Sequence, residues 1–397
     1  MSIVGICKKV VHKCIVLGNK IFYRFVPVDD KTVLFIAFHG RGYTDNPKAI
    51  HQYMIQNDAF KDYKFIWAIK NKNKKNLDIP DAKVIEYFSF PYFYYLAHSK
   101  YWIVNCKLPG YILKKDNQIY LQTWHGTPLK KLAHDIDVPE GTTFYRSQMD
   151  AKSMFKTYDI DVARYNYMIS PNTFCTKVFP SAFQISKDKL IETGYPRNDI
   201  LSFVDENRVK EKRALLNIPE DKKIILYAPT WRDNSYVASG YTFELKADFH
   251  KWKEKLGNEY VVLFKPHYLI INKYAKDESL DGFLYSIPAE NDIAYYYEMA
   301  DVLVTDYSSV FFDYAILKRP IYFYMYDLEE YANDLRGFYL DIYKDLPGKI
   351  YRIEEDMLDS IQKKEFDFEH LKAFNSYFNN KEDGYASKRV VDIVFGE

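Results

Sequence analysis

The sequence lacks an excess of either charge. Its 55 Lys and Arg residues nearly cancel its 54 Asp and Glu residues, which leaves a formal net charge of +1. Proteins dedicated to nucleic acid usually carry a strong basic excess, so we expect no nucleic-acid partner. Any anionic ligand must therefore be held by charges gathered locally. The 397 residues are long for one domain and comfortable for two.

Cysteine motifs are also missing. The four cysteines form no CxxC pair and no zinc-like array; they are Cys7, Cys14, Cys106 and Cys175. Scattered thiols without a secretory signal fit a reducing cytosol. The sequence contains no HExxH, GxSxG or Walker P-loop motif, which excludes the enzymes that those motifs define.

Long apolar runs are absent too. No stretch of 18 apolar residues occurs, so we predict no transmembrane helix. The segment 1–26 instead places apolar residues at helical spacing, with Lys and Arg between them: Ile3, Cys7, Val10, Cys14, Leu17 and Ile21. Charge interrupts this segment too often for a signal peptide. The pattern predicts a basic amphipathic helix, which can lie on an anionic membrane face or pack on its own domain.

What the sequence does contain is a repeated alternation of short apolar segments and helix-like ones. The first series includes "TVLFIAFHG", "KFIWAI", "KVIEYF", "YWIVNC" and "QIYLQTW"; the second includes "KIILYAPTW", "YVVLFKPH", "GFLYSI", "DVLVTDYSS" and "PIYFYMYD". Such alternation predicts an α/β fold with parallel sheets. We expect two Rossmann-like domains facing a central cleft, at 27–205 and 206–380. A last helix, within 381–397, would return toward the cleft or the first domain.

Polar residues end one strand of the second series in "VLVTDYSSVFFDYAILKRP". Asp306 closes the strand, and Ser308 and Ser309 precede an apolar helical run. Free backbone N–H groups at a helix N-terminus bind phosphate, whereas serine hydroxyls there can also simply cap the helix. Asp313, further along, is a candidate to accept hydrogen bonds from ribose hydroxyls.

Further cations end neighbouring strands of the same half. Lys265 and His267 are two residues apart in "LFKPHY", so in an extended chain both side chains leave the same face. Thr230 and Arg232 repeat this spacing in "YAPTWRD". Together these clusters predict a pocket for a nucleotide diphosphate. Arg336 in "DLRGFY" is one more candidate cation.

The first half has weaker motifs. Gly40 and Gly42 in "FHGRGYTDNP" follow the first strand without the third glycine of a dinucleotide fingerprint. A tight turn explains them, and a loop that lets substrate approach the backbone is the alternative. Two DxD strings, at 135–137 and 159–161, could hold a metal in some glycosyltransferases, but such strings are common by chance, and we predict no metal site.

The stretch "LQTWHGTPLKKLA" places His125 after a strand and before Gly126, which leaves room for a substrate. An imidazole titrates near neutral pH, as a general base requires. The alternative is a histidine that packs beside Trp124 or bonds a backbone group.

Taken in order, these motifs resemble the CDP-glycerol glycerophosphotransferase family, the teichoic acid primases and polymerases of Gram-positive bacteria. The similar segments span residues 30 to 397 and are "FHGRGYTDNPKAIHQYM", "TWHGTPLKKL", "GYPRNDIL", "YAPTWRD", "FKPHY", "TDYSSVFFDYAILKRPIYFYMYD", "RGFYLD" and "DGYASKRVVDIV". The resemblance implies a GT-B fold whose second domain holds CDP-glycerol. It also implies His125 as the base, and a peripheral protein on the cytoplasmic face of the membrane.

The acceptor implied by this resemblance is a polyprenyl-diphosphate-linked disaccharide, and CMP is the leaving group. Polymerising members generally carry extra N-terminal sequence, so a primase-type single transfer is favoured. We assign His125 and His267 to catalysis, His267 with Lys265 and Arg232 on the diphosphate. Fixed cations make a cofactor unnecessary, although Mg²⁺ is compatible with such a site.

Several alternatives stay open. They are a polyol-phosphate polymerase or ribitolphosphotransferase of teichoic acid or capsule synthesis, a GT-B glycosyltransferase or epimerase that uses a nucleotide sugar, and a non-catalytic membrane-bound scaffold. The donor alditol, the number of units added, the acceptor saccharide and the oligomeric state are left undetermined by the residues.

Overall fold

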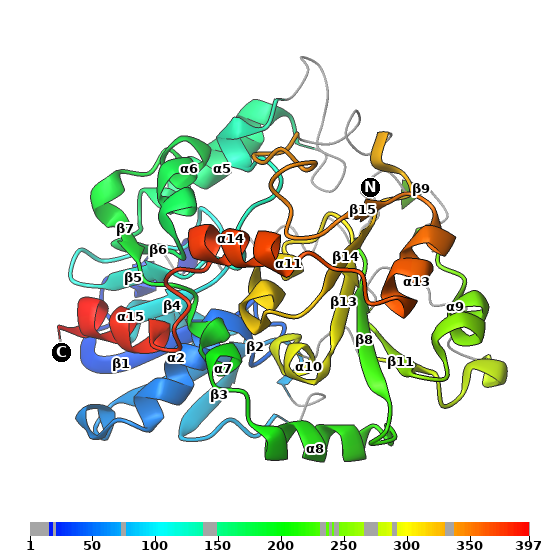
Figure 1. The fold of residues 1–397 in the computed structure, drawn as a ribbon. Coiled ribbons are helices and arrows are strands. Elements are labelled where there is room, and N and C mark those ends of the chain that lie inside the picture. Colours follow the sequence, from blue (N-terminus) through cyan, green and yellow to red (C-terminus); the bar gives the residue numbers. More distant parts are fainter. Residues whose placement is uncertain are drawn as a thin grey trace.

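The structure is a computed structural model that describes residues 16–18, 21–72, 77–137, 149–230, 236–237, 240–241, 246–265, 277–287, 292–329 and 337–396. Two parallel sheets stand side by side in it, the first blue to green and the second green to orange in Figure 1. Each sheet is covered by helices, as in doubly wound α/β folds. The predicted pair of Rossmann-like domains is confirmed.

The first sheet has seven parallel strands within the described residues. Their order across the sheet is β3 (Ala82–Glu86), β2 (Lys64–Ile69), β1 (Asp29–Ile36), β4 (Ser99–Val104), β5 (Ile119–Gln122), β6 (Tyr167–Ser170) and β7 (Leu190–Glu192). Strand β1 shows why these segments form a buried sheet: Val33 and Phe35 enter one apolar cluster, and Leu34 and Ile36 enter another on the opposite face.

The second sheet repeats the same order with six strands in the described part of the chain. They are β12 (Leu284–Ser286), β11 (Tyr260–Phe264), β8 (Lys223–Ala228), β13 (Val302–Thr305), β14 (Ile321–Tyr324) and β15 (Ile350–Tyr351). Numbered along the chain, both sheets contain the order 3-2-1-4-5-6, the order of the doubly wound dinucleotide-binding fold. A short antiparallel pair, β9 (Tyr236–Val237) and β10 (Gly240–Tyr241), lies outside the sheets.

The described helices that follow β1 lie between strands, except for the last three, which follow β15. In the first half they are α2 (Asp45–Ile55), α4 (Phe90–His98), α5 (Ala151–Val162), α6 (Thr173–Phe183) and α7 (Asp199–Ser202). In the second half they are α8 (Glu206–Leu215), α9 (Phe249–Leu256), α10 (Ala294–Met299), α11 (Val310–Tyr314), α13 (Glu354–Gln362), α14 (Phe368–Phe378) and α15 (Ala386–Phe395). Short 3-10 turns lie between them, among them η2 (Ala133–Asp135) and η4 (Pro196–Asn198).

The last helix returns to the first half. Helix α15 lies beside α2 (Figure 1), and its Val390, Val391 and Val394 join the apolar cluster that covers one face of the first sheet. Asp199 fixes its start, because its carboxylate accepts hydrogen bonds from the backbone N–H groups of Ala386 and Ser387, both at 2.8 Å. The motifs "GYPRNDIL" and "DGYASKRVVDIV" thus meet in space.

The predicted amphipathic helix over 1–26 falls mostly outside the described residues. Residues 16–18, 21 and 22 are helical, and the Phe22 ring lies 5.2 Å from that of Phe90 on α4. The exposed apolar side chains there include Leu17, Ile21 and Phe25. Among the described helices, none has the length and apolar content to cross a bilayer.

Candidate active site

The strand order of the second sheet reverses between β8 and β13. Thr230 follows β8 and Asp306 follows β13. Oδ1 of Asp306 accepts hydrogen bonds from the backbone N–H of Thr230 at 2.7 Å and of Tyr307 at 2.6 Å. Asp306 is buried and joins the two strand-end loops, at the position where doubly wound folds bind their ligands.

Ser309 faces the first half of the chain. It stands at the start of α11, but its side chain makes no capping hydrogen bond to that helix. A Cβ atom built on Gly126 would lie 2.9 Å from Oγ of Ser309. The loop that carries His125 therefore meets the serine loop of the second half. A side chain at position 126 would close this gap, which explains the glycine.

His125 itself follows β5 and is open to solvent. Its Nδ1 lies 2.7 Å from the backbone oxygen of Asn105, and because a carbonyl can only accept, Nδ1 carries the proton. Nε2 is then the unprotonated nitrogen, the one able to take a proton from a substrate. The sequence left two roles open for His125, a general base or a histidine that bonds the backbone. The structure is compatible with both, because one nitrogen bonds the backbone while the side chain stays exposed.

The backbone around His125 is strained. Trp124 (φ 52°), Phe38 (φ 44°) and His39 (φ 56°) all lie in the left-handed region, which non-glycine residues seldom adopt. Asn46 holds the histidine loop by donating hydrogen bonds to the carbonyl oxygens of Thr123 (3.3 Å) and Trp124 (3.0 Å). Such strain persists where surrounding contacts impose it, typically at functional sites.

The surroundings of His125 also tune it. Although the side chain is open to solvent, protein atoms surround it closely enough that loss of hydration lowers its pKa. The bond to Asn105 and the charge of Asp45 act in the opposite direction, whereas Arg197 adds to the lowering. The imidazole is therefore neutral at neutral pH, as a base must be.

Arg197 links the two halves behind His125. Its guanidinium pairs with Asp45 on α2 at 2.8 Å and with Asp313 on α11 at 2.8 Å, and all three side chains are nearly buried. Asn198 also donates to Asp313 at 3.0 Å. The structure thus gives Asp313 a role that the sequence did not predict. A ribose contact stays a prediction, and it would have to share a carboxylate whose two oxygens already accept hydrogen bonds.

The same network reaches the base. Asp45 accepts a hydrogen bond of 2.5 Å from the side chain of Asn105, the residue whose carbonyl binds His125. Sequence reasoning missed Asp45, Asn105 and Arg197. Asp45 stands in "FHGRGYTDNPKAIHQYM" and Arg197 in "GYPRNDIL", two motifs that served only to identify the family. Asp45 also gives α2 its polar start.

A second bridge joins the halves on the other side of His125. Lys130 pairs with Phe338 in an antiparallel bridge, and the backbone N–H of Lys131 donates to the Gly337 oxygen at 3.0 Å. Asp135 of the first DxD string accepts a hydrogen bond from the Tyr339 hydroxyl at 2.5 Å. Asp161 of the second string is buried against Arg164 and Tyr165. Both carboxylates thus hold the fold together.

Of the remaining predicted residues, some lie in the described part of the chain and some lie outside it. Lys265 follows β11, and its backbone N–H donates to the Tyr227 oxygen at 2.9 Å, which places it at the same edge as Thr230. Gly40 (φ 81°) is required by the backbone, since a Cβ there would meet Tyr87 at 2.9 Å, whereas Gly42 faces open space. Arg232, His267 and Arg336 lie outside the described residues.

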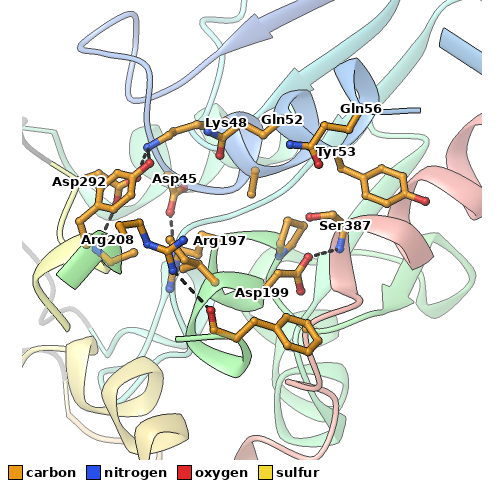
Figure 2. Close-up of a pocket in the computed structure, with 17 residues that line it drawn as sticks. Asp45, Lys48, Gln52, Tyr53, Gln56, Arg197, Asp199, Arg208, Asp292 and Ser387 are labelled. Atoms are coloured by element: carbon orange, nitrogen blue, oxygen red, sulfur yellow. Dashed lines mark hydrogen bonds and ion pairs between the residues drawn. The ribbon is translucent and has the colours of Figure 1, made fainter. Parts of the chain in front are cut away.

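A pocket of about 410 Å³ lies between the halves, and Arg197 is part of its lining. Figure 2 shows Lys48 pointing toward Asp292, and Arg197 next to Asp45, along its walls. The Lys48 ammonium pairs with Asp292 at 3.1 Å. Among the described residues, its lining includes none of those predicted for the active site. The pocket is therefore separate from the gap between Gly126 and Ser309.

The fold and the facing loops define a two-domain enzyme of the GT-B architecture, with His125 on one half close to the Ser309 loop of the other. A family model described as CDP-Glycerol:Poly(glycerophosphate) glycerophosphotransferase matches residues 19–396. The chain belongs to this family, which confirms the resemblance found in its motifs and makes it a transferase.

Named relatives agree. The chain is 41% identical over 380 residues to a teichoic acid poly(glycerol phosphate) polymerase of Bacillus spizizenii, covering 94% of this chain and 93% of the relative. It is 38% identical over 372 residues to a teichoic acid glycerol-phosphate transferase of Staphylococcus aureus, with 91% and 92% covered. A structure of the wall teichoic acid polymerase TagF, a variant soaked with CDPG, matches with a TM-score of 0.85 and 36% identity over 100% of this chain and 98% of that one.

Proposed function

We propose that this protein transfers glycerol phosphate from CDP-glycerol to a hydroxyl of a polyprenyl-diphosphate-linked acceptor and releases CMP, in wall teichoic acid synthesis. Family membership supports the donor and the type of reaction. The observation that carries the proposal is the approach of Gly126 to Ser309, because it brings the loop of the exposed His125 to the strand-end loop proposed to bind the donor.

In the proposed reaction the acceptor hydroxyl attacks the phosphorus that bears glycerol. Its proton passes to Nε2 of His125, the new P–O bond forms, and the P–O bond to CMP breaks. General base help of this kind contributes roughly 10²–10⁴-fold, or about 3–5 kcal/mol. The rest of the barrier must fall through positioning and charge neutralisation.

We assign that neutralisation to the second half. Lys265, Ser308 and Ser309 stand at strand ends of its sheet and would contact the diphosphate. Arg232, His267 and Arg336 keep the donor-side roles that the sequence predicts for them. No step of this mechanism requires a metal ion, and Mg²⁺ would assist only by shielding the diphosphate.

The number of units transferred is a separate matter. Sequence length favoured a single, primase-type transfer. Yet the Bacillus spizizenii polymerase is covered over 93% of its own length, so length does not separate the two types. The names of the relatives support glycerol phosphate transfer in both forms.

We also propose that the protein works at the cytoplasmic face of the membrane, since a lipid-linked acceptor lies there. The exposed Leu17, Ile21 and Phe25 beside the basic N-terminal segment support this location. Removing residues 1–26 should release the enzyme into the soluble fraction and leave its folded state intact. Aggregation of the truncated chain would instead make that segment part of the core.

Product analysis tests the function directly. The enzyme is incubated with CDP-glycerol and a soluble lipid-linked disaccharide analogue, and products are identified by mass spectrometry. One added glycerol phosphate defines a primase and a ladder defines a polymerase, each with equimolar CMP. Transfer from CDP-ribitol but not from CDP-glycerol would make ribitol the transferred alditol in place of glycerol. Release of UDP from a UDP-sugar would overturn the proposal. His125→Ala should abolish these products while CDP-glycerol still binds.

A further inference from the structure

The carboxyl edge of the first sheet carries a row of basic residues that the proposed transfer, apart from His125, does not use. Strands β2, β1, β4 and β5 lie next to one another in this order. The basic residues that follow them are Lys70 after β2, His39 and Arg41 after β1, Lys107 after β4 and His125 after β5. Because neighbouring strands lie about 4.8 Å apart, the row spans about 14 Å.

Contacts between the loops hold this row together. The backbone N–H of Lys70 donates to the Gly40 oxygen at 2.7 Å, and that of His39 contacts Sγ of Cys106 at 3.2 Å. Loss of hydration, followed by the charges of Lys70 and Arg41, lowers the pKa of His39 to about 4. The cations are therefore close enough to act on one imidazole.

Lys107 is the most firmly placed of them. It is half-buried, its ammonium donates to Oγ1 of Thr157, and the ring centroid of Tyr158 lies 3.9 Å away. An ammonium has three N–H donors. If the Thr157 hydroxyl and the Tyr158 ring each take one, one donor remains for a ligand. Burying a cation is unfavourable unless a partner compensates, which favours a site over a solvated surface.

Carboxylates beside the row already have other partners. Asp45 pairs with Arg197, and the oxygens of Glu86 accept the backbone N–H groups of Asn71 and Lys72 at 2.8 and 3.0 Å. Asp161, which lies close enough to act on Lys107, is paired with Arg164. Basic residues thus dominate this edge.

We propose that this row binds a phosphate group of the acceptor, on the side of His125 away from the donor. The inference rests on the proposed function, because it takes His125 as the base that meets the acceptor hydroxyl. A phosphodiester of a polyol phosphate chain and the diphosphate of a lipid carrier present the same anionic oxygens, which Lys and Arg bind through charge-assisted hydrogen bonds. The row would align the acceptor so that its hydroxyl reaches Nε2.

The test compares Lys70→Gln and the double variant Lys70→Gln/Arg41→Gln with Lys64→Gln. Lys64 begins the same strand β2 at the opposite edge of the sheet, where it forms an exposed pair with Asp29. KM is measured separately for CDP-glycerol and for two acceptors, one ending in glycerol phosphate and one whose only phosphates are the lipid diphosphate. Binding of a short oligo(glycerol phosphate) is measured by calorimetry without CDP-glycerol.

We expect the row variants to raise acceptor KM roughly ten- to hundredfold, with KM for CDP-glycerol and the Lys64→Gln enzyme unchanged. The acceptor whose KM rises identifies which phosphate is bound. A rise in KM for CDP-glycerol alone would overturn the inference and assign the row to the donor. Row variants with the same kinetics as Lys64→Gln would also overturn it, because the row would then be a solvated surface.

Calorimetry separates this inference from the proposed function. A wild-type enzyme that binds oligo(glycerol phosphate) but transfers nothing would refute the function and keep the site. A wild-type enzyme that transfers glycerol phosphate, with row variants that keep full acceptor KM and affinity, would refute the site alone.

Discussion

Nδ1 of His125 lies 2.7 Å from the backbone oxygen of Asn105. This contact fixes the tautomer, leaves Nε2 as the unprotonated nitrogen, and joins the imidazole to a network. The Asn105 side chain donates to Asp45, which pairs with Arg197, which pairs with Asp313 of the second half. His125 and the second half are thus connected through four successive contacts.

The pH dependence of transfer should report this imidazole. Loss of hydration lowers the pKa of His125 below its ordinary value of 6.5, and only the neutral form can accept a proton. We expect kcat/KM to rise with pH along an acidic limb centred below pH 6.5 and then to level off. A limb centred above pH 6.5, measured in initial-rate assays, would contradict this assignment.

Gly126→Ala should slow transfer without unfolding either half. The new methyl group would lie 2.9 Å from Oγ of Ser309, closer than real contacts allow, so the Ser309 hydroxyl must turn away from its present position. We expect kcat/KM to fall at least tenfold, with the melting temperature nearly unchanged. The double variant Gly126→Ala/Ser309→Gly removes the clash and should recover part of the rate relative to Ser309→Gly alone. Equal rates for the wild type and Gly126→Ala would show that the loops do not meet.

Arg197→Met should destabilise the fold strongly. It would leave the buried carboxylates of Asp45 and Asp313 without their cation, a change that typically costs 3–5 kcal/mol. Lys31→Met is the matched control, because the Lys31–Asp62 pair is 55% and 64% exposed and such pairs contribute roughly 0–1 kcal/mol. Urea unfolding measures both. If both variants lost the same free energy of unfolding, Arg197 would not have the structural role proposed for it.

Glu382 should make stability depend on pH. Its Oε2 is buried without a hydrogen-bond partner, and burial followed by the charges of Asp313 and Asp199 raises its pKa from 4.5 to about 8. The folded state then holds a proton that the unfolded state releases. This contribution, on the order of a few kcal/mol, is complete below pH 4.5 and is lost as pH rises to 8.

The measurement is the free energy of unfolding from pH 5 to pH 8, in the wild type and in Glu382→Gln. An amide does not titrate, so the variant should lose the part of the slope that Glu382 causes, up to about 1.4 kcal/mol per pH unit. Identical slopes in both proteins would show that Glu382 ionises normally.

The strands, and the polar residues that follow them, were predictable from local patterns. Apolar runs such as "KIILYA" and "VLVT" end abruptly at polar residues, and parallel strands bring those ends to one edge. The position of His125 after β5 follows from the same logic. The reaction was predicted from the family motifs, because the strand pattern alone does not indicate which reaction is catalysed.

Other features depend on contacts between distant residues, and no local pattern encodes them. Arg197 meets Asp45 and Asp313 across 152 and 116 residues of sequence. Asp313 looked like a ribose ligand because its place in the helix is typical of one. The contact of Asp135, in the DxD string at 135–137, is of the same kind: its carboxylate bonds Tyr339, 204 residues away.

If His125 acts across the gap on a donor held by the other half, a crystal structure of His125→Asn with CDP-glycerol will show it. We expect the glycerol-bearing phosphate between residue 125 and Ser308 and Ser309, with cytidine beside β8 and β13. A donor bound in the pocket beside Lys48 and Asp292 (Figure 2), or with its phosphates turned away from residue 125, would contradict it.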